Sequence, residues 1–117
     1  MYQSNRLVFD AIRSIDSATF TGSYQAVGTS FTYPVRILKI VNNSTKDVTV
    51  SLDGSTDNDY IPTGSYATYD AGTNKGTSAD VLEFQKGSQI YVKGSAGTGL
   101  VYIVTLVAFT PTMTIPQ

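Results

Sequence analysis

The sequence contains no cysteine, no histidine and no tryptophan, and it has a single glutamate among its 117 residues. Without histidine and cysteine the chain lacks the usual zinc ligand sets, the thiolates of iron–sulfur clusters, a Ser-His triad and a thiol nucleophile. No other residue set supplies an activated nucleophile or a tunable acid–base pair. We therefore predict a protein that is not an enzyme and that uses no cofactor.

Long hydrophobic runs and basic clusters are also missing. The longest apolar run, residues 100–109, has about half the roughly 20 residues that a membrane-spanning helix needs, and polar residues follow Met1. The sequence pI is about 5.0, and no basic cluster is interleaved with aromatic residues. Nucleic-acid binding requires such cations. We expect neither a signal peptide, nor a membrane anchor, nor a nucleic-acid partner.

What the chain does have is typical of β-structure. Eight tyrosines, five phenylalanines, eleven valines and sixteen threonines favour pleated, half-buried backbone over helix. A chain of this length buries roughly two-thirds of its unfolded surface, which suffices for one domain. Short strands separated by turn residues predict an all-β fold, an antiparallel β-sandwich of jelly-roll-like form with about eight strands and short terminal arms.

The two ends of the chain differ from the middle in their pattern. Residues 1–16 have apolar side chains at near-helical spacing and are interpreted as an N-terminal arm or a short helix. The sandwich domain is assigned to residues 17–110, and residues 111–117, which include two prolines, to an extended C-terminal arm. The apolar residues at near-helical spacing are Leu7, Val8, Ile12 and Ile15.

Two predicted strands, residues 35–41 and 100–109, are apolar on both faces. Such a strand must be covered on both faces, whereas a two-layer sandwich has one interior. The second face requires the chain's own arm, an unusually thick core or another subunit, and the last of these predicts a homo-oligomer. The uncovered face of residues 100–109 is centred on either Tyr102 or Ile103. The residues predicted for an apolar interface are Ile37, Val41, Val101, Tyr102, Ile103 and Phe109.

The segment 53–59 is the most acidic part of the sequence, with Asp53, Asp57 and Asp59. Several converging oxygens could bind a hard cation such as Ca²⁺, but the order of ligands does not match an EF-hand, and the same composition is typical of solvated turns. We interpret the segment as a turn, predict no metal site, and expect its three carboxylates to meet cations on a partner surface.

Aromatic residues in the acidic half raise one alternative function. Tyr60, Tyr66 and Tyr69, if exposed together, would form a platform on which sugar rings stack, and nearby amides would pair with hydroxyl groups. The chain would then be a carbohydrate-binding module with a glycan partner. Aromatic residues in small β-proteins more often belong to the core.

Residues 35–76, VRILKIVNNSTKDVTVSLDGSTDNDYIPTGSYATYDAGTNKG, carry a series of turn-and-strand motifs over about a third of the chain. A strand ends in I-V-N-N at 40–43 and is followed by D-V-T-V-S-L-D-G at 47–54. Then come an Asp-rich turn, Y-I-P at 60–62, and Tyr69-Asp70 with Asn74-Lys75. This series resembles small virion structural proteins of tailed bacteriophages.

The resemblance implies a β-sandwich that works by assembling. It implies an auxiliary or decoration subunit bound to the capsid, made in the host cytoplasm and located in the virion. Its partners would be copies of itself and other virion proteins, either the major capsid protein or the proteins of the portal vertex. A collar or tail-adaptor subunit is the related alternative.

Overall fold

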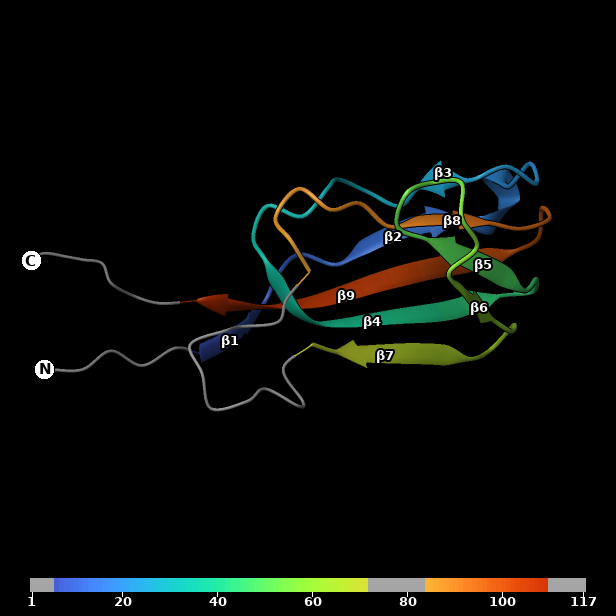
Figure 1. Cartoon of the computed structure of the whole chain (residues 1–117). Coiled ribbons are helices and arrows are strands. Elements are labelled where there is room, and N and C mark those ends of the chain that lie inside the picture. The colour runs from blue at the N-terminus through green and yellow to red at the C-terminus, as the bar shows by residue number, and fades with distance from the viewer. Residues whose placement is uncertain (1–5, 72–83, 110–117) are drawn as a thin grey trace, which may run out of the picture.

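The computed structural model describes residues 6–71 and 84–109, which form strands joined by turns and loops (Figure 1). A short 3-10 helix, η1, spans Ser17–Thr19. The strands are β1 (Arg6–Phe9), β2 (Arg13–Asp16), β3 (Gln25–Ala26), β4 (Val35–Ser44), β5 (Val48–Ser51), β6 (Asp59–Ile61), β7 (Tyr66–Asp70), β8 (Tyr91–Lys93) and β9 (Gly99–Phe109). No helix among the described residues is long and apolar enough to cross a membrane.

The strands form two sheets that lie one above the other in Figure 1. Sheet A has the order β1-β9-β4-β7, with β2 also paired to β9, and sheet B has the order β3-β8-β5-β6. The pairs nest inward along the sequence: β1 and β2 pair with β9, β3 with β8, β4 with β7 and β5 with β6, all antiparallel. A long hairpin rolled into two sheets produces this order. The predicted all-β, antiparallel, jelly-roll-like sandwich is confirmed.

The core lies between the sheets and takes alternate residues from each strand. In β9, Val101 and Ile103 are completely buried and Val107 is nearly so. Val92 of β8 and Val48 of β5 face them from sheet B and are also completely buried. Because side chains alternate between the two faces of a strand, the residues between these positions point away from the core.

Residues 6–9 and 13–16 form strands, and not the short helix that was one expectation. Leu7 and Val8 lie in β1, and Ile15 lies in β2, where it packs against the core. The long strand β9 has a free edge opposite β4, and β1 and β2 satisfy the backbone groups along it. The sandwich therefore begins before residue 17. Residues 1–5 and the expected C-terminal arm at 111–117 lie outside the described residues.

A buried asparagine lies near the end of β4. Strand β4 continues to Ser44, and Asn42 is completely buried. Its side-chain amide donates to the carbonyl oxygens of Lys46 (2.8 Å) and Ile61 (2.9 Å). Its Oδ1 accepts from the Ser44 hydroxyl at 2.6 Å. Asn42 thereby links β4 to the end of β6 through hydrogen bonds. Strand β4 ends at Ser44, and the chain bends at Thr45 and Lys46 before β5.

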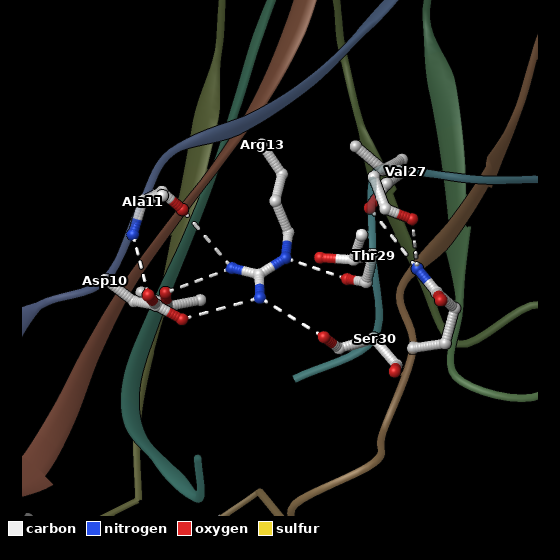
Figure 2. Close-up of polar contacts among 9 residues, drawn as sticks. Asp10, Ala11, Arg13, Val27, Thr29 and Ser30 are labelled. Carbon is white, nitrogen blue, oxygen red and sulfur yellow. Dashed lines mark hydrogen bonds and ion pairs between the residues drawn. The ribbon is translucent and has the colours of Figure 1, made fainter. Parts of the chain in front are cut away.

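The buried side chain of Arg13 connects β2 to the loop after β3 through hydrogen bonds (Figure 2). Arg13 donates from Nε to the carbonyl oxygen of Thr29 at 2.8 Å and from Nη2 to that of Ser30 at 3.3 Å. Its Nη1 donates to the Ala11 carbonyl at 3.3 Å and to the Thr105 hydroxyl at 3.4 Å. Buried polar groups are costly unless they are paired, and this guanidinium finds partners on three segments of the chain.

Candidate functional site: the outer face of sheet A

The register of sheet A defines a surface on the side away from sheet B. Outward residues of β9 lie opposite outward residues of β4: Leu106 opposite Ile37, Val104 opposite Lys39 and Tyr102 opposite Val41. On the far side of β9, Phe9 of β1 lies opposite Leu106. On the far side of β4, Tyr66 of β7 lies opposite Val41. The apolar residues of this surface are Leu7, Phe9, Ile37, Val41, Tyr66, Tyr102, Val104 and Leu106, and we call them together the apolar face. The same registers place the polar residues Ser14, Lys39, Thr68 and Asp70 among them.

The apolar face is open to solvent at its margins and half-buried at its centre. Phe9 is 72% exposed, Tyr66 68% and Leu7 46%. The central members on β4 and β9 are half-buried among their neighbours. The described elements form only two layers, so no third layer of theirs covers this face. Large apolar side chains gathered on one exposed surface and bordered by polar residues mark interaction sites.

The residues predicted for the apolar interface lie in different parts of the structure, some on the apolar face and others in the core. Ile37, Val41 and Tyr102 lie on the apolar face. Val101 and Ile103 are completely buried between the sheets, so they cannot face a partner. The alternation along β9 thereby decides between Tyr102 and Ile103 as the outward centre, in favour of Tyr102. Phe109 is the last residue of β9, and its side chain lies outside what the structure describes.

The carboxylate of Asp53 holds a turn together. Its Oδ1 accepts from the backbone N–H groups of Ser55 (2.8 Å) and Thr56 (2.7 Å) and from the Ser51 hydroxyl (2.8 Å). Its Oδ2 accepts from the Thr56 hydroxyl at 2.8 Å. These hydrogen bonds, above all those from the two backbone groups, hold the pKa of Asp53 well below its usual range. This is the solvated turn that the sequence predicted.

The other two acidic residues are also paired within the chain. Asp57 accepts from the Tyr24 hydroxyl and forms an ion pair with Lys93 at 3.2 Å. Asp59 accepts from the Tyr60 N–H at 2.7 Å and from the Tyr69 hydroxyl. Within residues 6–71 and 84–109 no group of three or more His, Cys, Asp or Glu side chains could hold a metal ion. The three carboxylates belong to the sheet B side, so they do not extend the apolar face.

The three tyrosines proposed as one sugar platform are dispersed. Tyr60 lies opposite Thr49 on the outer face of sheet B, and Tyr66 lies on the outer face of sheet A. Tyr69 packs against the core and meets Asp59 across the open edge between the sheets. The prediction of a platform made by these three residues is therefore wrong, because their strands place them on three different surfaces.

A cavity of about 170 Å³ lies at that open edge, beside the Tyr69–Asp59 hydrogen bond. Its walls are mostly apolar, from Leu38 and Ile40 of β4 and from Val50, Phe84 and Ile90. Its volume is close to that of engineered cavities that take a benzene ring, and it is below the usual size of roughly 300 Å³ or more for ligand pockets. The cavity is thus too small for most cofactors or substrates.

The hydrogen bonds between tyrosines and aspartates predict an alkaline transition. Burial and the Asp57 carboxylate raise the pKa of Tyr24 to about 12. Burial and Asp59 raise the pKa of Tyr69 well above its usual value. Because these hydroxyls ionise near pH 10 in the unfolded chain, their contribution to stability is complete below pH 10. The contribution of Tyr24 is lost as the pH rises through its folded pKa of about 12, and that of Tyr69 is lost as the pH rises through its own raised pKa.

Absorbance at 295 nm during an alkaline titration measures this transition. We expect the ionisation of Tyr24 and Tyr69 to appear as a late step above pH 10, together with unfolding. The Tyr24→Phe variant should lose part of the late step and keep the rest. A single transition near pH 10 for all tyrosines, with the fold intact, would contradict these hydrogen bonds.

The apolar face carries no nucleophile and no acid–base pair among its members. What it can do is exclude water against a second apolar surface. Comparisons of the chain with protein family models, with curated proteins and with solved structures find no match.

Proposed function

We propose that this protein is a structural subunit of a tailed-bacteriophage virion that associates with copies of itself and attaches to the particle as a capsid auxiliary or decoration protein. The apolar face is the observation that carries the assembly part of this proposal. The motifs in residues 35–76 support the virion part. A collar or tail-adaptor subunit would use the same face and is the alternative within this class.

The dimensions of the apolar face suit a stable protein–protein contact. Four strands at about 4.8 Å spacing and the length of β9 give a surface roughly 19 Å wide and about 35 Å long. A standard interface buries about 800 Å² on each partner, which is of the same order. Aromatic residues are enriched at such contacts, and Phe9, Tyr66 and Tyr102 supply them. Lys39 is the charged member of the central rows on β4 and β9.

Two leucines with nearly equal exposure test self-association. Leu7 is 46% exposed on the apolar face, and Leu52 is 47% exposed in the loop that follows β5 in sheet B. We expect the wild-type chain to form an oligomer at micromolar concentration and the Leu7→Asp variant to shift toward the monomer by about tenfold or more in the dissociation constant. Leu52→Asp should associate as the wild type does.

Sedimentation velocity measures the mass, and circular dichroism verifies that both variants are folded. A wild-type chain that stays monomeric would overturn the assembly proposal, and so would equal effects of the two substitutions. Attachment is tested with purified phage particles: co-sedimentation with heads supports the decoration role, and co-sedimentation with tails alone supports the collar alternative.

A further inference from the structure

The outer face of sheet B, on the opposite side of the molecule from the apolar face, has a different chemistry. Three residues form a row across it, because Thr49 of β5 lies opposite Lys93 of β8 on one side and opposite Tyr60 of β6 on the other. With strands about 4.8 Å apart, the row spans roughly 10 Å, about the length of two linked sugar rings.

One end of the row is an exposed aromatic ring that is held in place. Tyr60 is 56% exposed, and its hydroxyl donates to Oδ2 of Asp47 at 2.6 Å. Asp47 is itself held, since its Oδ1 accepts from the Thr63 N–H at 2.9 Å. A ring fixed in this way loses little further freedom when a ligand stacks on it, which favours binding.

The other end of the row carries a second ring. The Lys93 ammonium lies 4.7 Å from the centre of the Tyr24 ring and 3.2 Å from Oδ1 of Asp57. Asp57 also accepts from the Tyr24 hydroxyl. Lys93, Tyr24 and Asp57 thereby orient one another, and the carboxylate of Asp57 balances the positive charge of Lys93.

An open depression runs along this row, lined by Thr49, Asp57, Asn58, Asp59 and Tyr60. Asn58 uses its Oδ1 to accept from the Leu52 N–H at 2.8 Å. Among the described residues, none pairs with its Nδ2, with Oδ2 of Asp57 or with the Thr49 hydroxyl. The depression thus offers one amide donor, one carboxylate acceptor and one hydroxyl group beside an aromatic ring.

We infer that the outer face of sheet B binds a neutral oligosaccharide, with the Tyr60 ring stacked on one sugar and with Asn58, Asp57 and Thr49 paired to its hydroxyl groups. Vicinal hydroxyls both donate and accept, so they match this mixed set. Asp47, Asp57 and Asp59 disfavour sialylated or sulfated chains. The inference is independent of the virion proposal, because no member of the apolar face takes part.

Saturation-transfer NMR on the full chain, with maltose, cellobiose, lactose and chitobiose as neutral probes and sialyllactose as a charged one, tests the site. We expect at least one neutral disaccharide to bind and sialyllactose to bind more weakly. Tyr60→Ala should weaken that binding by about tenfold, whereas Tyr60→Phe, which keeps the ring, should retain most of it.

Tyr66→Ala is the matched control, because Tyr66 is an exposed tyrosine on the apolar face. It should leave sugar binding unchanged, and Thr49→Val should weaken it without altering the fold. The inference is overturned if the wild type binds none of the neutral probes, if sialyllactose binds best, or if Tyr66→Ala costs as much as Tyr60→Ala. None of these outcomes bears on self-association, which the leucine variants test separately.

Discussion

Replacing Ile103 with aspartate is expected to prevent the chain from folding. Ile103 is completely buried in the middle of β9, the strand that pairs with β1, β2 and β4. The substitution removes an aliphatic side chain, which costs about 2 to 5 kcal/mol, and adds the desolvation of an unpaired carboxylate, which costs several kcal/mol more. The sum is comparable to the total stability of a small domain, roughly 5 to 15 kcal/mol.

The neighbouring residue provides the control. Val104 lies on the same strand but points to the apolar face, where it is half-buried. We expect Val104→Asp to leave a folded β-protein by circular dichroism and to abolish self-association in sedimentation. A folded, assembled Ile103→Asp variant would show that this strand does not pass through the core. An unfolded Val104→Asp variant would show that the outer face also contributes to folding.

Replacing Arg13 with alanine is expected to lower the free energy of unfolding by about 3 to 5 kcal/mol. The guanidinium is the hydrogen-bond donor for carbonyl oxygens of Thr29 and Ser30, and it forms an ion pair with Asp10 at 3.5 Å. It also lies 5.2 Å from the centre of the Phe31 ring. Without it the loop after β3 loses its attachment to β2, and several partly buried acceptors lose their partner.

Urea denaturation followed by circular dichroism measures the change. Arg13→Lys should recover only part of the loss, because an ammonium cannot reproduce the planar arrangement of the guanidinium donors. Lys86→Ala, at an exposed position, should change stability by less than about 0.5 kcal/mol. If Arg13→Ala were as harmless as Lys86→Ala, the network in Figure 2 would not stabilise the fold.

The two outer faces of the sandwich have different proposed functions: self-association on sheet A and sugar binding on sheet B. Association through the apolar face of sheet A leaves sheet B exposed on every copy. An oligomer would therefore display several weak sugar sites together, and multivalent attachment can exceed the affinity of a single site by orders of magnitude. We expect Val104→Asp to weaken retention of the protein on a glycan-coated surface while leaving disaccharide binding in solution unchanged.

The sequence alone was sufficient to predict the all-β fold class and to identify two strands with apolar residues on both faces. Composition and period-two alternation are local properties, and they indicated an all-β sandwich whose strands at 35–41 and 100–109 were apolar on both faces. The turn at Asp53 was likewise predictable, because its carboxylate bonds to backbone groups two and three residues away.

Only the tertiary structure decided which surface each side chain occupies. Slipping a strand by one residue exchanges its two faces, so the choice between Tyr102 and Ile103 required the pairing of β9 with β4. Pairing with the other edge of β9 made residues 6–9 and 13–16 into strands. The strand pairings also dispersed the three tyrosines, because Tyr60 lies in sheet B whereas Tyr66 and Tyr69 lie on β7 of sheet A. Partners such as Tyr24 and Asp57, or Arg13 and Thr105, are far apart in the chain, and no local pattern encodes contacts at that separation.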